Sequence, residues 1–272
     1  MARFKSVIEI LKLLDKSNCR NCGEKTCFAF SAAVLKGQKK LSKCTHLDPL
    51  VIQRYADQEG RQPGLAQDRA EAVKLLRQRI SSIDLSEAAR RLGEKYADGK
   101  LTIKCMGKDF SVDAAGNITT DIHVNHWVTM PILCYITDGA GVPASGRWVP
   151  FRELKGGTDW FRLFNQMCEK PLKKIADTYT DLFEDMLHIF SAKQVKNVYD
   201  SDISIVLHPL PKVPILICYW RPDDGLESSL HIFFDETADR NLTIESIYTL
   251  AAGLLNMFKK IALTHGVALK KP

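Results

Sequence analysis

The sequence predicts an α+β protein: a small helical module with four cysteines, followed by an α+β domain with an antiparallel sheet and flanking helices. Three observations predict this fold class. Four of the eight cysteines lie near the start of the chain, at Cys19, Cys22, Cys27 and Cys44. A polar stretch containing Gly, Pro and Gln follows at 57–68 and is typical of a linker. Beyond it, apolar residues recur at helical and at strand spacing to near the end of the chain.

The domain boundaries follow from this pattern. We expect residues 1–56 to form the module that carries the four cysteines, 57–68 the linker and 69–272 the second domain. The chain has 272 residues and is 45% hydrophobic, which is enough for packed cores. The opening helical pattern lacks the continuous apolar core of a signal peptide, and no stretch approaches the ~18 to 20 apolar residues of a membrane span. We therefore expect a cytoplasmic protein, where thiols stay reduced.

The cysteine spacing, C-x2-C-x4-C-x16-C, predicts a metal site. Four thiolates in this arrangement suit the ligation of one [4Fe–4S] cluster. Structural zinc and unrelated thiols are the alternatives, although a zinc site usually has two C-x2-C pairs and only one is present. The spacing is not that of a bacterial ferredoxin repeat, because four residues precede the third cysteine and Thr45 follows the fourth.

The residues between these cysteines have roles of their own. Gly23 allows a tight turn and a close approach of the backbone to the cluster. Thr26 is expected to cap a helix that begins near Cys27 and stops at Gly37. We expect amide groups at the start of this helix to point toward the cluster and to tune its potential.

About the first fifty residues resemble the four-cysteine cluster domain of the corrinoid iron–sulfur protein large subunit and of an Rnf electron-transport subunit. The residues that carry this resemblance are Leu14, Lys16, Asn18, Cys19, Cys22, Gly23, Glu24, Thr26, Cys27, Phe30, Ala32, Gly37 and Cys44. The resemblance implies one [4Fe–4S] cluster on the four cysteines and low-potential electron transfer.

The charge of the chain is concentrated in its first part. The net charge is +6, and residues 1–60 hold eleven Lys or Arg against six Asp or Glu, a local charge of +5. Such cations can offset an anionic cluster and steer an acidic redox partner, or can form an ordinary solvated surface. Nucleic-acid binding fits less well, because no reader motif accompanies the basic residues.

The second domain alternates helices and strands. We expect one or two helices over 69–98 and helices over 158–190 and 243–263. Residues 126–136 are apolar enough for a buried helix, and a strand is the alternative because periodicity alone does not separate the two. Residues 101–105 and 109–113 have the alternation of paired strands, and 202–235 that of a three-stranded antiparallel meander.

Most of residues 70–265 resemble an uncharacterised domain of unknown function that occurs in strict anaerobes, often fused to the same cluster module. The resemblance is carried by residues 146–154, Gly156-Gly157, 209–214, Trp220 and Phe234-Asp235. It implies no activity. Residues 221–225, Arg-Pro-Asp-Asp-Gly, stand where that family has an acidic segment.

Trp148, Arg152 and Trp220 are the candidate ligand site of the second domain. In an extended segment Arg152 falls on the Trp148 side, where a guanidinium beside an indole can bind an anionic ring or a carboxylate. We favour the alternative that Arg152 and Glu153 form an ordinary ion pair that fastens a loop to the sheet.

The remaining cysteines and histidines are expected to be structural. Cys105, Cys134, Cys168 and Cys218 are far apart in the sequence, and buried thiols pack as small hydrophobes. A zinc site at His123 and His126 is not expected, because no acidic ligand follows. His208 and His231 are single residues on predicted strands and are expected to make structural hydrogen bonds.

The favoured function is low-potential single-electron transfer to a redox partner protein, or to a ligand of the second domain, in anaerobic metabolism. One alternative is a redox-sensing or binding module with a structural or regulatory cluster. Another is a redox enzyme with a corrinoid, a flavin or a small molecule bound near Arg152 and Trp220. The sequence holds no catalytic motif.

Overall fold

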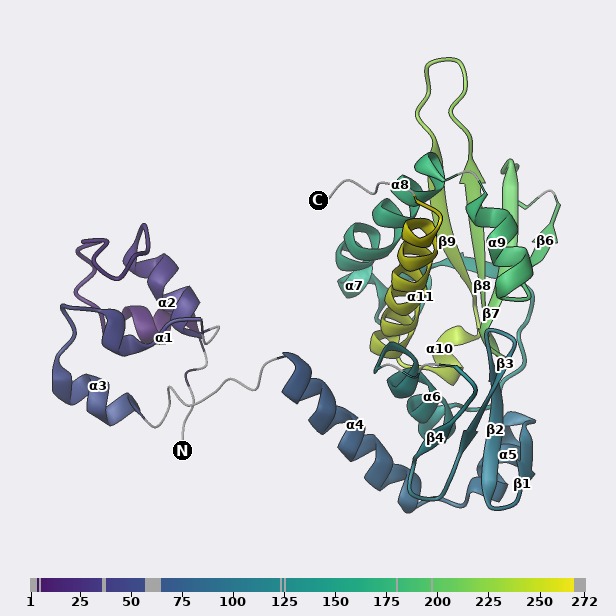
Figure 1. The fold of residues 1–272 in the computed structure, drawn as a ribbon, viewed down its shortest axis with the longest axis horizontal. Helices are drawn as coiled ribbons and strands as arrows, with labels where there is room; N and C mark the ends of the chain where they lie inside the picture. The colour runs from purple at the N-terminus through teal and green to yellow at the C-terminus, as the bar shows by residue number, and fades with distance from the viewer. Residues whose placement is uncertain are drawn as a thin grey trace. The chain divides into compact units, whose positions relative to one another are not determined.

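The computed structural model describes residues 4, 6–35, 38–56, 65–122, 124, 126–179, 181–196 and 198–266. The chain divides into two compact units, Met1–Ala70 and Glu71–Pro272. Helices and antiparallel sheets confirm the predicted α+β class (Figure 1). Within the predicted linker, 57–64 lie outside the described residues, and 65–68 begin helix α4 (Leu65–Ser81). No helix in the described ranges has the length and apolarity to span a membrane.

The first unit is built from short helices around a small core. Its elements are α1 (Val7–Leu11), α2 (Cys27–Leu35), the 3-10 turn η1 (Leu41–Lys43) and α3 (Pro49–Ala56). The buried core consists of Ile10, Leu14, Cys27, Phe30, Leu41, Cys44 and Leu47. Two of the predicted ligands, Cys27 and Cys44, therefore belong to the core of this unit.

The early part of the second unit combines a short helix with a small four-stranded sheet. Helix α5 (Leu85–Leu92) starts at Asp84, whose carboxylate accepts hydrogen bonds from the Ser86 and Glu87 amides, and ends at the left-handed Gly93. The antiparallel strands β1 (Lys95–Ala97), β2 (Lys100–Cys105), β3 (Lys108–Val112) and β4 (Ile118–Thr119) follow in sequence order. The predicted paired strands are therefore confirmed. Helix α6 (His126–Asp138) then matches the predicted helix.

A five-stranded antiparallel sheet forms the rest of the framework, in the order β5-β9-β8-β7-β6. Strand β5 (Trp148–Pro150) leads into a 3-10 turn, η2 (Phe151–Glu153). Strand β6 (Lys193–Val195) lies at the other edge, and β7 (Ile203–Leu210), β8 (Val213–Trp220) and β9 (Ser229–Asp235) form the predicted meander. Leu216 pairs with Val206 on one side and with Phe233 on the other, which fixes the register of the central strands.

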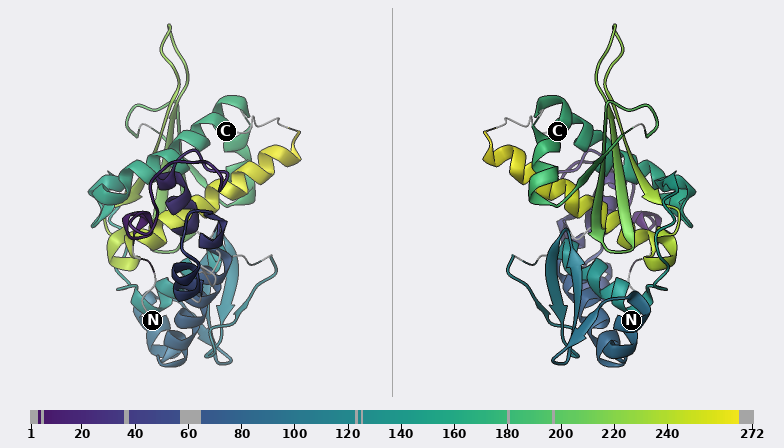
Figure 2. Two further views of the ribbon diagram at one scale, coloured as in Figure 1. Left: turned by 90° about the vertical axis from the view of Figure 1, so that its left-hand side faces the viewer. Right: turned by 90° about the vertical axis from the view of Figure 1, so that its right-hand side faces the viewer.

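The later helical elements of this unit cover one face of the five-stranded sheet. They are α7 (Gly157–Phe164), the π-helical turn η3 (Asn165–Glu169), α8 (Lys170–Thr178), α9 (Leu182–Ile189), α10 (Ala238–Asn241) and α11 (Ile244–Thr264). In Figure 2, α11 passes in front of the strands in one view and behind them in the opposite view. Alternate residues of β8, including Ile215, Ile217 and Tyr219, face this helical layer. On the other face, Leu216 and Cys218 belong to a smaller apolar cluster.

Gly157 shows how closely the chain approaches itself at the start of α7. A side-chain carbon at this position would lie 2.0 Å from the carbonyl oxygen of Phe151, so only glycine fits. Gly156 precedes it with a φ of 79°, a left-handed conformation that favours glycine. Gly156 and Gly157 therefore form the turn that connects η2 to α7.

Candidate metal centre and pocket

The loop before α2 positions Cys19, Cys22 and Cys27 through an unusual backbone. Lys16, Asn18 and Arg20 all have positive φ values, of 61°, 53° and 65°, alternating with ordinary residues. Asn tolerates the left-handed region better than most residues, because its short amide side chain can form local hydrogen bonds. The Asn18 Oδ1 atom accepts a hydrogen bond of 2.7 Å from the Cys27 amide. This bond ties the loop to the start of α2.

Gly23 and Lys39 hold the segment around Cys22. Gly23 has a φ of 78°, and its amide donates to the Arg20 carbonyl at 2.8 Å, so the predicted tight turn is present. The Lys39 ammonium donates to the Cys22 carbonyl at 2.7 Å and pairs with Glu24 at 2.9 Å. Lys39, 17 positions further along the chain, thus fixes the backbone at Cys22.

The start of α2 differs in one respect from the sequence expectation. Thr26 caps the helix as predicted, since its Oγ1 accepts from the Ala29 amide at 3.0 Å. The Cys27 amide, however, donates to Asn18. Two of the amides expected to point toward a cluster are therefore already used by side-chain caps. The predicted stop at Gly37 lies outside the described residues.

Cys44 enters the site from the turn η1, where its amide donates to the Leu41 carbonyl at 2.9 Å. Burial raises the pKa of the Cys44 thiol, and the nearby charges of Asp15, Cys22 and Cys19 act in the same direction. The His46 backbone amide opposes this shift through a hydrogen bond to the thiol. These influences place Cys44 in the electrostatic neighbourhood of two other predicted ligands.

The donor set fits an iron–sulfur cluster. All four cysteines are free thiols; Cys19 is exposed, Cys22 is half-buried, and Cys27 and Cys44 are buried. Among the described residues, no three Cys, His, Asp or Glu side chains are placed to hold one metal ion. The ligands of a four-iron cluster lie further apart than those of a single metal ion, because each thiolate binds a different iron atom. Four soft thiolates on one loop-and-helix frame match that requirement.

The predicted ligand site of the second unit is only partly assembled. Trp148 and Trp220 pack around the same apolar cluster, which contains Leu216 and Cys218. Arg152 does not continue the strand alternation, because β5 ends at Pro150 and η2 begins at the next residue. The placement of Arg152 by alternation from Trp148 was therefore wrong. The Arg152 guanidinium lies 5.7 Å from the centre of the Phe161 ring.

The prediction that Arg152 and Glu153 form an ion pair is also wrong. Within the described ranges, no ion pair joins these two side chains, which are neighbours in a 3-10 turn and so do not face each other. His231 forms the ion pair of this region instead, with its Nδ1 3.6 Å from Glu169 Oε1. The Trp220 ring meets the His231 ring edge to face, with centroids 5.8 Å apart.

Glu169 is a buried carboxylate at the end of the π-helical turn. It accepts hydrogen bonds from the Asn165 side chain at 2.8 Å and from the Ile232 amide at 3.1 Å. Burial alone would raise the pKa of Glu169, but its bonds to His231, Ile232 and Asn165 lower it overall. The Glu169 carboxylate in turn raises the pKa of His231. The expectation that His231 makes structural hydrogen bonds is confirmed.

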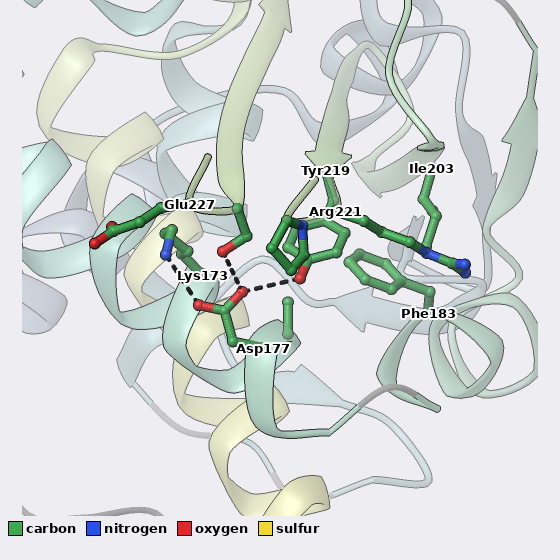
Figure 3. A pocket seen from close by; sticks show the side chains of 10 residues that line it. Lys173, Asp177, Phe183, Ile203, Tyr219, Arg221 and Glu227 are labelled. Atoms are coloured by element: carbon green, nitrogen blue, oxygen red, sulfur yellow. Dashed lines mark hydrogen bonds and ion pairs between the residues drawn. The ribbon is translucent and has the colours of Figure 1, made fainter. Parts of the chain in front are cut away.

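A pocket of about 710 Å³ lies elsewhere in the second unit, where the loop between β8 and β9 meets the ends of these strands (Figure 3). Its lining consists of Lys173, Ala176, Asp177, Phe183, Ile203, Tyr219, Arg221, Pro222, Glu227 and Ser228. None of Trp148, Arg152 and Trp220 is among these residues. Sequence reasoning missed the pocket, because Lys173 and Asp177 look like an ordinary helical ion pair with four-residue spacing.

The four later cysteines are free thiols, as expected. Cys105, Cys168 and Cys218 are buried and Cys134 is half-buried. Burial raises the pKa of Cys105 to about 12 and that of Cys168 to about 12. Among the histidines of the rejected zinc pair, His123 and the side chain of His126 lie outside the described residues.

Comparison with protein-family models gives two matches. The model described as "Domain of unknown function (DUF3786)" matches residues 84–257, well over half of the chain. The chain belongs to the DUF3786 family. A second model, described as "Putative Fe-S cluster", matches residues 14–46, which include all four candidate ligands. The second match supports an iron–sulfur cofactor in this member of the DUF3786 family. Neither the curated proteins nor the solved structures give a match.

Proposed function

We propose that Cys19, Cys22, Cys27 and Cys44 hold one [4Fe–4S] cluster and that the protein is a low-potential, single-electron carrier of anaerobic metabolism. Such a cluster would supply the reversible gain and loss of one electron. The observation that carries the proposal is the set of four free thiols, three of them on the loop and helix start that the Asn18–Cys27 hydrogen bond ties together and the fourth at the turn η1. A reducing cytoplasm suits this donor set.

The protein's own residues would hold the cluster and limit its contact with water. Asn18 and Lys39 fix the backbone at Cys27 and Cys22. Because Cys27 and Cys44 are buried in the unit's apolar core, two of the proposed ligands would lie where a low dielectric strengthens the effect of nearby dipoles. Fixed ligands and a dry inner side would keep structural change small when the charge of the site changes.

The exposed side of the site is where an electron would leave or enter. Cys19 is exposed and is followed by the exposed Arg20, and Lys16 and Lys25 are also exposed. These cations belong to the segment with a local charge of +5. We propose that an acidic redox partner docks here, because attraction between opposite charges speeds the encounter of two proteins. Salt screens this attraction, so docking should weaken as salt increases.

The test is electron paramagnetic resonance of the full chain after anaerobic reconstitution and reduction. We expect about four irons per chain and a spin signal of a reduced cluster. Cys27→Ser should lose that signal, whereas Cys134→Ser, the matched control outside the ligand set, should keep it. An unchanged spectrum in Cys27→Ser would refute the ligand assignment. Electron transfer itself is tested by reoxidation with an acidic ferredoxin-type acceptor, whose rate should fall as salt increases.

A further inference from the structure

We propose that the pocket of Figure 3 binds a planar aromatic carboxylate, held by Arg221 at the carboxylate and by the Tyr219 and Phe183 rings at the apolar body. This goes beyond the proposed function, because the site belongs to the second unit and requires no cluster.

The polar floor of the pocket is internally neutralised. Asp177 accepts hydrogen bonds from the Tyr219 hydroxyl at 2.9 Å and the Ser228 hydroxyl at 2.6 Å, and it pairs with Lys173 at 3.0 Å. Burial would raise the pKa of Asp177, but these donors lower it, so the carboxylate stays ionised beside the Lys173 ammonium. This pair therefore offers a ligand no net charge.

Arg221 supplies the cation that is not neutralised. Its backbone amide donates to Asp202 at 2.7 Å, which fixes the residue at the end of β8. In the part of the chain that the structure describes, its guanidinium has no hydrogen bond or ion pair. Figure 3 shows the Arg221 guanidinium and the Glu227 carboxylate at opposite ends of the lining side chains. An anionic group of a ligand is therefore expected at the Arg221 end.

The apolar wall suits a flat ring system. The Tyr219 and Phe183 rings have centroids 5.3 Å apart and are inclined by 36°, and Ala176, Ile203 and Pro222 complete the wall. A volume of about 710 Å³ is ample for two fused rings. Arg221 precedes Pro222, so the cation and the apolar wall are joined in one short segment.

The anion is a carboxylate because one guanidinium is available to it. The planar fork of Arg221 matches two carboxylate oxygens with two parallel hydrogen bonds. A phosphate dianion would need a second cation, and Lys173 is already compensated by Asp177. A cationic ligand would need a free carboxylate beside the ring, whereas Asp177 already has three donors.

The polar floor of the pocket indicates what the ligand carries away from its carboxylate. The Tyr219 and Ser228 hydroxyls both donate to Asp177, which leaves oxygen lone pairs as acceptors. Burial and the bond to Asp177 raise the pKa of Tyr219, so its hydroxyl stays protonated. A ligand hydroxyl that donates here would add a second polar contact.

The experiment is a fluorescence titration of the full chain with 6-hydroxy-2-naphthoate, with 2-naphthol as the probe that lacks the carboxylate. We expect saturable binding of the naphthoate and at least about tenfold weaker binding of the naphthol. Arg221→Gln should weaken naphthoate binding by about tenfold or more, because it removes charge-assisted hydrogen bonds. The exposed Arg162, which is not among the lining residues, provides the matched control Arg162→Gln.

Two results would overturn the inference: no binding of the naphthoate to the wild-type chain, or equal affinity in Arg221→Gln and wild type. Tyr219→Phe keeps the ring and removes the hydroxyl, so it should retain binding with reduced affinity; an increase would contradict the assigned contact. Melting temperatures of the variants show whether each is folded. The cluster's spin signal is measured separately, so failure here leaves the proposed function standing.

Discussion

Replacement of Asn18 tests whether the loop before α2 is held by one side chain in a left-handed conformation. In Asn18→Ala the Cys27 amide loses its acceptor at 2.7 Å, and alanine must adopt a φ of 53°. Loss of a cap of this kind costs about 1 kcal/mol. The left-handed conformation costs a further ~1 to 2 kcal/mol for a residue with a plain Cβ. We therefore expect the first unit to lose about 2 to 3 kcal/mol of stability.

Two further variants separate these contributions. Asn18→Gly relieves the conformational cost but not the lost hydrogen bond, so about 1 kcal/mol of destabilisation should remain. Asn18→Asp keeps an acceptor oxygen and should lie closest to wild type. The matched control is Asn21→Ala, since among the described residues the exposed Asn21 side chain makes only a long bond of 3.4 Å to Thr45.

The assay is anaerobic urea unfolding of the reconstituted full chain, followed through cluster absorbance and through circular dichroism. The expected order of stability is wild type, then Asn18→Asp, Asn18→Gly and Asn18→Ala. Equal unfolding midpoints for Asn18→Ala and Asn21→Ala would show that this side chain does not hold the loop.

Three further predictions concern the second unit. For the Glu169–His231 pair, the lowered pKa of Glu169 adds stability above its unfolded value of 4.5 that is lost as pH falls through the folded value. The raised pKa of His231 adds stability below pH 6.5 that is lost as pH rises through the folded value. In a plot of the urea unfolding midpoint against pH, Glu169→Gln should therefore reduce the pH dependence in both the acidic and the near-neutral range. Gly157→Ala places a carbon 2.0 Å from the Phe151 carbonyl and should cost more than about 2 kcal/mol by urea unfolding. Gly146 has open space around it but a φ of 81°, so Gly146→Ala should cost only the ~1 to 2 kcal/mol of the left-handed conformation. Asp235→Ala removes a buried carboxylate that accepts from the Gly146 amide at 2.7 Å and should cost about 3 kcal/mol in the same assay; a loss below about 0.5 kcal/mol would contradict the assigned hydrogen bonds.

Local patterns were sufficient to predict most of the framework. The meander over 202–235 was predictable because its strands are joined by short connections and pair with their sequence neighbours. The helix over 126–136 was predicted from its continuous apolar character. The end of β5 was missed, because nothing in the residues around Arg152 marks the change from strand to 3-10 turn.

Part of the candidate sites could also be predicted from local sequence, and part could not. The cysteine quartet lies within 26 residues, so spacing alone indicated a metal site. Asn18 and Lys39 could not be assigned their roles, since a left-handed φ and a contact across 17 positions depend on the folded loop. The pocket residues Lys173, Phe183 and Arg221 come from separate elements and meet only through tertiary packing. Such convergence leaves no periodic signal in the sequence.

The most direct test of the central claim is elemental analysis of the full chain purified without oxygen, combined with the Mössbauer spectrum of iron-57-labelled protein. We predict about four irons and four sulfides per chain and a spectrum of one four-iron cluster. One zinc per chain with no iron would contradict the account.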